Sequence, residues 1–362
     1  MKAQSPIDII ILGFGKIGQE LTRQIHSTTG RTRRCYPNFH VIALADSKAL
    51  FYRHTGLVSA EIQLAMALKK QGASLKDMDS ALPLEDISTL LKPNTIVIDT
   101  TASSETLPLL RQAIKVDSGI VLANKIPLCQ PWAEVQKLYS YPLLKYEATV
   151  GAGLPIISTL KYLLDTGDKL ESIVGCLSGT LGYLCSCLEE GVSYSQAIRD
   201  AHALCYTEPD PRQDLGGMDV ARKAIILSRT AGIPAEISDL TVEPLFPSVL
   251  EDISVDSFLQ NSQRENNRYA KLVEKASVDQ KVPRYTARIT ADGIQAGLVM
   301  VDKTNSLGSL KGTDNFIALN THRYSPSPLV ISGPGAGIEV TAAGVFGDII
   351  QLGREMLEGG KA

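Results

Sequence analysis

The chain of 362 residues is longer than one hydrophobic core usually allows, so its length predicts two domains, or one domain with a large insertion. Apolar residues make up 44% and charged residues 21%, which is typical of a soluble globular protein, and the net charge of −3 argues against nucleic-acid binding. No segment has the apolar length needed to cross a membrane, and the first residues do not resemble a secretory signal. We therefore expect a cytoplasmic α/β protein that acts on a small molecule, with no nucleic-acid or membrane partner.

Strand and helix signals alternate over the first 150 residues. The strand-like runs are continuously apolar, which favours strands buried on both faces of a parallel sheet. Strands are expected at residues 7–12, 39–44, 95–100 and 119–124, and helices at 16–25, 59–71, 104–114 and 131–140.

The pattern changes after Val150. The later strand-like runs alternate apolar with polar residues between glycine turns, which predicts an antiparallel sheet with one covered face. Strands are expected at 169–177, 284–290, 293–301, 315–321 and 328–333, and helices at 154–167, 193–204 and 217–231. The polar stretch 260–277 is typical of a solvated helix, and an amphipathic helix is expected over 336–357.

A glycine-rich loop, Gly13-Phe14-Gly15-Lys16-Ile17-Gly18, directly follows the first expected strand and opens the first expected helix. In this context the GxGxxG pattern predicts a dinucleotide site, because glycine permits the tight turn and the close approach of backbone to a pyrophosphate. The helix N-terminus would then face the phosphate charge. The alternative interpretation is a purely structural turn.

Polar residues also follow three other expected strands, at the carboxyl edge where open α/β sheets bind ligands. Asp46 ends the second strand and is a candidate for binding the adenosine ribose, although a plain strand-end role is an alternative. An acid there favours NAD, whereas nearby Lys48 or Arg53 could accommodate the 2′-phosphate of NADP. The sequence leaves this choice open. Thr100, Thr101, Ser103, Asn124 and Lys125 occupy the other strand ends.

The stretch from Cys205 to Lys223 places several carboxylates around two prolines and a glycine pair. The prolines favour extended backbone at the acids that precede them. On the helix that follows, Asp219 and Lys223 are four residues apart and share a face. Fixed acids suit a substrate ammonium, and a lysine suits proton transfer. The alternative is a surface loop with an ordinary salt bridge.

This stretch, YTEPDPRQDLGGMDVARK (206–223), resembles the signature of the homoserine dehydrogenase family. Further motifs resemble the family in the same order along nearly the whole chain. They are the Gly13–Gly18 loop, Asn124-Lys125, and the segments 147–156, 178–183 and 334–348.

The resemblance implies a Rossmann domain at 1–148, a catalytic and dimerisation domain at 149–333, and a C-terminal segment, 334–362, that returns to the nucleotide domain. It implies NAD(P)-dependent interconversion of L-homoserine and L-aspartate 4-semialdehyde, a step towards threonine and methionine. It also implies a homodimer. The sequence shows neither an aspartokinase segment nor an ACT-type module, so we expect the short form, without threonine inhibition through such a module.

The resemblance further implies a role for individual residues. Lys223 and Lys125 would handle protons, with Asp219 beside them. Glu208, Asp214, Gly179, Thr180 and Tyr206 would bind substrate. The cofactor, NADP or NAD, would contact Gly13, Phe14, Gly15, Lys16, Ile17, Gly18, Asp46, Thr100, Thr101, Ser103, Asn124, Lys125, Gly335 and Gly337. Glu147, Val150, Ala152 and Leu154 match the family's monovalent-cation (Na⁺) site.

One residue departs from the family pattern, and two alternative functions remain open. Cys205 stands where the family usually has glycine, so a left-handed helix end there would be strained or altered. Another NAD(P)-dependent amino-acid or semialdehyde dehydrogenase would share the glycine loop without needing the Glu208–Lys223 array. A non-catalytic NAD(H) sensor would be expected to carry a basic helical module, which the sequence does not show.

Overall fold

The computed structural model describes residues 6–28 and 37–359. The chain divides into two compact units, which are described separately. Unit 1 comprises Met1–Gly153 and Gly337–Ala362, and unit 2 comprises Leu154–Ala336. A search of the described residues finds no helix that is both long and apolar enough to span a membrane.

Unit 1 is built on a sheet of seven described strands in the order β4-β3-β2-β1-β5-β6-β7. They are β1 (Ile7–Leu12), β2 (Phe39–Ala45), β3 (Leu50–Tyr52), β4 (Ala81–Leu82), β5 (Thr95–Asp99), β6 (Gly119–Leu122) and β7 (Leu144–Lys145). The parallel pairing expected for the apolar strands is confirmed for β1, β2, β5 and β6. The strand β3 pairs antiparallel with both β2 and the edge strand β4, which the sequence pattern did not indicate. The link between β2 and β3 is too short for a parallel crossover.

The helices of unit 1 lie close to the expected ranges. They are α1 (Lys16–Thr28), α2 (Ser59–Lys70), α3 (Leu107–Lys115), α4 (Trp132–Tyr139) and α12 (Ile338–Gly359), with 3₁₀ helices η1 (Leu75–Asp77), η2 (Leu84–Leu90), η3 (Ile126–Cys129) and η4 (Glu147–Thr149). The central strands supply a core of fully buried side chains such as Ile9, Ile11 and Ile98.

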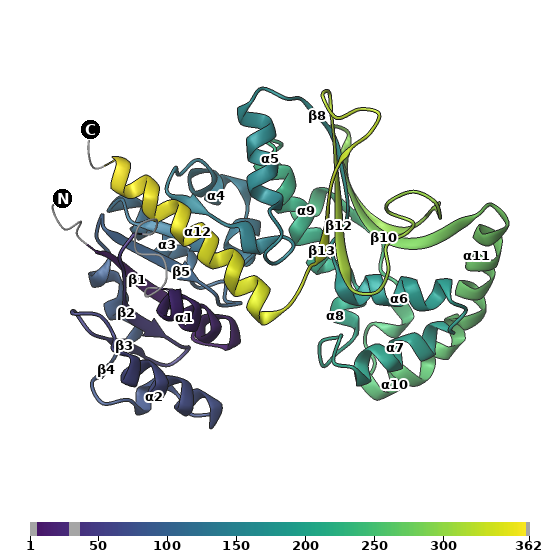
Figure 1. Ribbon diagram of the computed structural model, residues 1–362. Helices are drawn as coiled ribbons and strands as arrows, with labels where there is room; N and C mark the ends of the chain where they lie inside the picture. Colours follow the sequence, from purple (N-terminus) through teal and green to yellow (C-terminus); the bar gives the residue numbers. More distant parts are fainter. Residues whose placement is uncertain (1–5, 29–36, 360–362) are drawn as a thin grey trace. The chain divides into compact units, whose positions relative to one another are not determined.

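The C-terminal helix α12 belongs to unit 1, as expected for a segment that returns to the nucleotide domain (Figure 1). Val345, Ile349 and Leu352 are fully buried in the same core as the central strands. Close backbone contacts complete the packing. A Cβ on Gly153 would lie 2.5 Å from the Val340 carbonyl oxygen, and a Cβ on Gly344 would lie 2.9 Å from the Ala152 carbonyl oxygen.

Unit 2 contains a sheet of six described strands in the order β13-β12-β8-β10-β11-β9. They are β8 (Leu170–Cys176), β9 (Leu240–Val242), β10 (Lys281–Thr290), β11 (Gly293–Asp302), β12 (Asp314–Thr321) and β13 (Leu329–Pro334). The expected antiparallel pairing holds for most of the sheet. The edge pair β9–β11 is parallel, so the sheet is mixed rather than antiparallel throughout.

Helices cover one face of this sheet, and α6, α9 and α11 pack against β10. The helices are α5 (Ile156–Asp165), α6 (Gly179–Glu189), α7 (Tyr194–Ala203), α8 (Arg212–Leu215), α9 (Met218–Thr230), α10 (Val255–Asn261) and α11 (Asn266–Val278), with 3₁₀ helices η5 (Ile237–Asp239), η6 (Ser248–Leu250) and η7 (Ser262–Glu265). The helix α6 had not been expected, and the expected helix at 260–277 is divided between η7 and α11.

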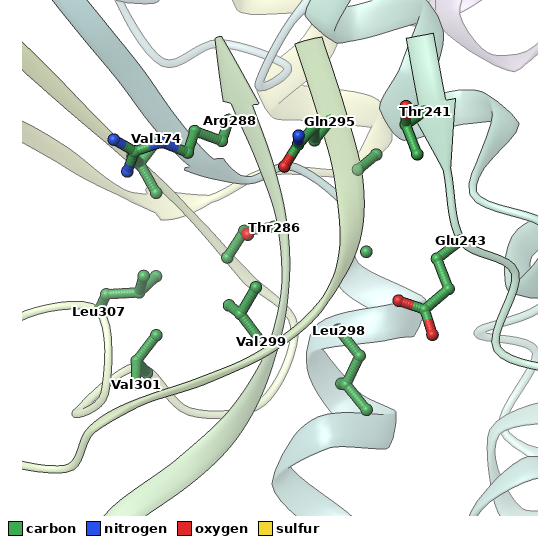
Figure 2. A pocket seen from close by; sticks show the side chains of 12 residues that line it. Val174, Thr241, Glu243, Thr286, Arg288, Gln295, Leu298, Val299, Val301 and Leu307 are labelled. Carbon is green, nitrogen blue, oxygen red and sulfur yellow. The ribbon is translucent and has the colours of Figure 1, made fainter. Parts of the chain in front are cut away.

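The opposite face of the sheet carries a pocket of about 500 Å³ (Figure 2). Thr286 and Arg288 on β10 line it together with Gln295 and Val299 on β11. Val299 is 39% exposed, which is unusual for a β-branched residue in the middle of a strand.

Candidate active site

The glycine loop of unit 1 connects β1 directly to α1, and the chain itself requires two of its glycines. Gly13 has a φ of +86°, and a Cβ there would lie 2.8 Å from the Thr101 side chain. A Cβ on Gly18 would lie 2.5 Å from the Gly13 carbonyl oxygen. The Thr100 hydroxyl donates to the Leu12 and Gly13 carbonyls, each at 2.9 Å. The tight strand–helix turn predicted from the sequence is therefore present.

Gly15 differs from Gly13 and Gly18, because no packing contact requires a glycine there. A Cβ there would meet nothing closer than 4.0 Å, and both Gly15 and Lys16 are exposed. The first turn of α1 carries no acidic residue, so its N-terminal N–H groups present an uncompensated positive end. Phe14 is fully buried, which leaves only its backbone for ligand contact. The residues present fit a dinucleotide phosphate, because the space over Gly15 is free of protein atoms.

A pocket of about 900 Å³ opens beside this loop within unit 1. It brings together six of the predicted cofactor residues, namely Gly13, Phe14, Gly15, Asp46, Thr101 and Ser103. Lys16, Ile17, Gly18, Thr100, Asn124 and Lys125 are not among the residues that line it. Gly337 belongs to unit 1 and Gly335 to unit 2.

Asp46 lies at the end of β2 with its carboxylate almost fully enclosed. One oxygen accepts from the Lys48 and Ala49 N–H groups at 2.9 and 3.2 Å. The other accepts from the Lys69 ammonium at 2.8 Å and from the Leu75 N–H at 2.9 Å. Burial raises the pKa of Asp46, but these hydrogen bonds outweigh it and hold the pKa below its usual range.

The buried carboxylate of Asp99 organises the next strand end, a role that the sequence analysis did not assign. It accepts from the Thr101 N–H and hydroxyl at 2.9 and 2.7 Å and from the Asn124 amide at 3.0 Å. Asn124 also donates to Thr101 and to the Ser103 carbonyl and accepts from the Ile126 N–H, so its amide supports the turn that carries Lys125. The sequence signal that could have indicated this role is an acid at the end of a largely apolar strand.

The predicted cation residues are close in sequence: Glu147, Val150 and Ala152 belong to unit 1 and Leu154 to unit 2. Glu147 is buried, and its N–H donates to the Asp348 carboxylate at 2.8 Å. Gly151 and Ala152 both have left-handed backbone, with φ of +79° and +56°. Leu154 begins unit 2. No group of three or more His, Cys, Asp or Glu side chains suited to a metal occurs among the described residues, so any cation here would depend on carbonyl oxygens.

In unit 2, the first turns of α9 carry the predicted lysine–acid pair. Lys223 is only 9% exposed, and its ammonium donates to the Asp219 carboxylate at 2.8 Å and to the Leu177 carbonyl at 2.5 Å. Gly217 precedes the helix with a φ of +73°, and a Cβ there would lie 2.1 Å from the Tyr285 hydroxyl. Gly217 therefore lets the start of α9 lie directly against Tyr285 on β10.

The start of α6 meets the acidic stretch. Thr180 donates from its hydroxyl to the Tyr206 carbonyl at 2.5 Å and to the Asp214 carboxylate at 3.2 Å. Asp214 also accepts from the Glu208 N–H at 2.8 Å. Gly179 opens α6 and packs against Thr313, to which a Cβ on Gly179 would approach within 3.1 Å. Unit 2 thus brings together all the predicted substrate residues.

Burial raises the pKa of Asp214, and the nearby Glu208 and Asp219 carboxylates add to this effect, while hydrogen bonds from Glu208 and Thr180 oppose it. The Glu208, Asp214 and Asp219 carboxylates therefore influence one another, and Asp219 is the one that pairs with Lys223.

Cys205 adopts the left-handed conformation that was expected to need glycine, with a φ of +56°. The N–H of Cys205 bonds the His202 carbonyl and the N–H of Tyr206 bonds the Ala201 carbonyl, at 3.1 and 2.9 Å. These two bonds form a Schellman end for α7. Helix α7 therefore keeps its Schellman end, and Cys205 adopts a backbone conformation that is strained for a residue with a Cβ.

Asn315 on β12 is a further residue that the sequence analysis missed. It is 1% exposed, and neither atom of its amide group has a hydrogen-bond partner in the described part of the chain. Its side chain packs against Gly335, where a Cβ would lie 1.9 Å from the amide carbon. Gly335 is thus required by packing inside unit 2, independently of any cofactor contact.

Comparisons with known proteins identify the family of this chain. The family model for homoserine dehydrogenase matches residues 155–350. Homoserine dehydrogenase from Saccharomyces cerevisiae is 31% identical over 97% of this chain and 99% of its own length. The maize protein named bifunctional aspartokinase/homoserine dehydrogenase 2, chloroplastic, is 34% identical over 97% of this chain, which spans 39% of that relative.

A solved structure has the same fold. A hyperthermophilic archaeal homoserine dehydrogenase in complex with NADPH superposes with a TM-score of 0.74, at 22% identity, over 97% of this chain and 98% of the other. The match to the yeast relative covers 97% of this chain, and the family model covers more than half of it. The chain therefore belongs to the homoserine dehydrogenase family.

Proposed function

We propose that this protein interconverts L-homoserine and L-aspartate 4-semialdehyde with a nicotinamide cofactor, NAD(H) or NADP(H). The observation that carries the proposal is the Lys223 ammonium, which is buried and held by the Asp219 carboxylate and the Leu177 carbonyl beside the acidic cluster. Membership of the family supports the reaction class.

In the proposed reaction, the carboxylates of Glu208, Asp214 and Asp219 hold the substrate ammonium. Lys223 donates a proton to the substrate oxygen during aldehyde reduction and removes one during alcohol oxidation. Its charge also stabilises the developing alkoxide. Thr180 keeps Asp214 oriented through its hydroxyl. A bound nicotinamide would supply or accept the hydride.

In unit 1, the glycine loop would hold the cofactor pyrophosphate over the open backbone of Gly15. The Asp99–Asn124 pair would keep the strand end rigid, so that Lys125 can serve as the second proton-handling lysine. Fixing the reactants in this way accounts for a large part of the rate in such reactions.

The decisive test is a spectrophotometric assay of L-homoserine oxidation, run separately with NAD⁺ and NADP⁺. A panel of other hydroxy-amino acids serves as the control for substrate class. A rate of homoserine oxidation well above the rates for the other hydroxy-amino acids supports the proposal. Preference for another hydroxy-amino acid would instead support a different dehydrogenase built on the same fold.

We further propose that two copies of the chain associate through the open face of the unit 2 sheet (Figure 2). Glu243 and Arg288 line its pocket with opposite charges, so a two-fold-related copy offers complementary partners. The Val299 and Val330 side chains on this face, 39% and 38% exposed, would be buried by the second copy.

Light scattering coupled to size-exclusion chromatography measures the molar mass in solution and so tests whether the protein is a dimer. Val299→Arg should shift the wild-type dimer to monomer. Val278→Arg, at a position 80% exposed on α11, should leave it dimeric. A wild-type protein that elutes as a monomer at micromolar concentration contradicts this part of the proposal.

A monovalent cation is proposed beside Glu147, coordinated by backbone oxygens of Val150, Ala152 and Leu154. The left-handed backbone at Gly151 and Ala152 supports it, because it turns successive carbonyls of this loop away from regular pairing. Thermal unfolding in NaCl and in choline chloride at equal ionic strength is the test. Sodium should raise Tm for the wild type but not for Glu147→Gln, and equal Tm values in both salts would remove the site.

A further inference from the structure

Arg284 on β10 is a buried arginine that takes no part in the proposed reaction. It lies on the same face of the strand as Thr286 and Arg288, since residues two apart share a face. It is nevertheless only 2% exposed, because the β11–β12 loop, residues 303–313, covers it. A guanidinium that loses its water must find other acceptors for its N–H groups. Its partners therefore show what Arg284 holds in place.

The guanidinium donates mainly to backbone carbonyls of the β11–β12 loop. Nε donates to the Leu307 carbonyl at 3.2 Å. Nη2 donates to the Gly308 and Leu310 carbonyls at 2.5 and 2.8 Å. Nη1 donates to the Pro283 carbonyl, on the same strand, at 2.6 Å. Because three carbonyls that are close in sequence bind one rigid fork, Arg284 fixes the path of this loop.

The same guanidinium also binds the last residue of α6. Nη2 lies 2.9 Å from one carboxylate oxygen of Glu189, and the other oxygen accepts from the Lys311 ammonium at 2.5 Å. Burial raises the pKa of Glu189, but the hydrogen bonds from Lys311 and Arg284 outweigh it and hold the pKa below its usual range. Arg284 is thus joined to α6 through a carboxylate and to the loop through three carbonyls.

The β11–β12 loop in turn packs closely along α6. The Gly312 N–H donates to the Ser186 hydroxyl at 3.0 Å. A Cβ on Gly182 would lie 2.9 Å from the Gly312 carbonyl oxygen, and a Cβ on Gly179 would lie 3.1 Å from the Thr313 carbonyl oxygen. Since the loop and the helix touch through backbone atoms, a shift of one requires a shift of the other.

The start of α6 carries contacts of the proposed substrate residues. The Thr180 hydroxyl donates to the Asp214 carboxylate at 3.2 Å and to the Tyr206 carbonyl at 2.5 Å. Leu177, two residues before the helix, accepts from the Lys223 ammonium. A displacement of α6 would therefore misplace the hydroxyl that orients Asp214.

We infer that Arg284 is a positioning residue for the proposed substrate site. It clamps the β11–β12 loop onto α6 and so keeps Thr180 against Asp214. None of its hydrogen bonds in the described part of the chain goes to a proposed substrate residue, so it acts through α6 alone. Asp214 is proposed to hold the substrate ammonium, so the effect belongs to substrate binding rather than to dinucleotide binding. This inference rests on the proposed function and adds a residue to it.

Steady-state kinetics of Arg284→Met tests the inference. Methionine fills much of the same space but donates no hydrogen bond, so it removes the clamp. KM for homoserine should rise by about tenfold while kcat changes by less than about threefold, the pattern of a lost binding contribution. The dinucleotide Kd, measured by calorimetry, should stay within about twofold of wild type. Arg284→Lys keeps the charge beside Glu189 but offers its donors from a single nitrogen, so its KM should be intermediate.

A second variant disturbs the same contact from the α6 side and leaves Arg284 intact. Helix propensity alone would make Gly182→Ala stabilising. The Gly312 carbonyl should instead force α6 and the loop apart, and KM for homoserine should rise by about threefold or more. Gly347→Ala on α12 is the matched control, because a Cβ there would meet nothing within 4 Å, and it should leave KM unchanged.

Arg229→Met controls for the loss of a buried arginine as such. Arg229 lies in the last turn of α9, is 3% exposed, and donates to the Ala235 carbonyl and to the Glu236 carboxylate. Its replacement should lower Tm without raising KM for homoserine. A comparable rise in KM in this variant would assign the effect to a general loss of stability and overturn the positioning role.

A wild-type KM for homoserine in both Arg284→Met and Gly182→Ala also overturns the inference and leaves the proposed dehydrogenase standing. If Arg284→Met does not fold, Gly182→Ala and Arg284→Lys decide the question, and an unchanged KM in these two has the same meaning. A wild-type protein that does not oxidise homoserine overturns the proposed function and the positioning role together.

Discussion

The ammonium of Lys223 donates to the backbone carbonyl of Leu177 at 2.5 Å, which ties the second turn of α9 to the residue between β8 and α6. The Asp219 carboxylate holds the same ammonium at 2.8 Å. Two of the three N–H groups are therefore held by the protein, and the proposed mechanism assigns the third to the substrate oxygen. Lys223 is thus positioned by its fold before substrate arrives.

Replacing Lys223 with alanine should lower kcat for homoserine oxidation by roughly 10²–10⁴-fold, the usual contribution of a positioned proton-transfer group. Dinucleotide binding should persist, since the glycine loop belongs to the other unit. Steady-state kinetics and cofactor titration measure the two effects. Lys271→Ala, at an exposed lysine on α11, is the matched control. Turnover close to wild type in Lys223→Ala would remove this lysine from the mechanism.

The raised pKa of Asp214 predicts how substrate affinity depends on pH. Burial, together with the Glu208 and Asp219 carboxylates, favours the protonated form of Asp214, which cannot attract an ammonium. As pH falls, homoserine affinity should decline at a higher pH than an ordinary aspartate would produce. KM measured against pH is the test. Asp214→Asn should raise KM at neutral pH and flatten this part of the profile. An unchanged profile in that variant would assign the titration to another group.

Regular elements could be predicted from the sequence wherever one physical signal dominated. The strands β1, β2, β5 and β6 are predominantly apolar, and the glycine loop between β1 and α1 has a fixed pattern. The stretch from Glu208 to Lys223 was recognisable because prolines, glycines and acids occur at close spacing. In each case the determining residues are neighbours in sequence.

Features that depend on distant contacts could not be predicted. Asp99 gains its role from Asn124, and Asn315 on β12 packs against Gly335, which directly follows β13. The parallel edge pair β9–β11 brings together segments about fifty residues apart, and β9 is only a short run between turns. Helix α6 begins with a glycine-rich sequence whose helical propensity is low, and its burial against β10 compensates for this. Tertiary packing decided all of these.

Cys205 predicts a stabilising substitution. It holds a φ of +56° at the end of α7, a conformation that costs a residue with a Cβ roughly 1–2 kcal/mol. Cys205→Gly removes this cost but increases the entropy of the unfolded chain, so the free energy of unfolding should rise by a net of about 0.5–1 kcal/mol. Denaturant unfolding measures it. Leu204→Gly, at the preceding residue with a φ of −80°, should destabilise instead. A loss of stability in both variants would contradict the strain at Cys205.

Gly217 predicts a large loss of stability from the addition of a single methyl group. Its φ of +73° disfavours any side chain, and a Cβ would also lie 2.1 Å from the Tyr285 hydroxyl, which bonds the Glu243 carbonyl at 2.9 Å. Gly217→Ala should therefore lower the free energy of unfolding by roughly 2–4 kcal/mol, because backbone strain and overpacking add.

The matched control for this substitution is Gly191→Ala, whose φ of +84° imposes the same strain but whose Cβ would meet nothing within 4 Å. Its expected loss is only about 1 kcal/mol. Tyr285→Phe removes the clashing hydroxyl, so in the Gly217→Ala background it should recover part of the lost stability in a double-mutant cycle. Equal losses for the two glycine variants would show that Tyr285 does not constrain the start of α9, and the position of Lys223 would then depend on its own two hydrogen bonds alone.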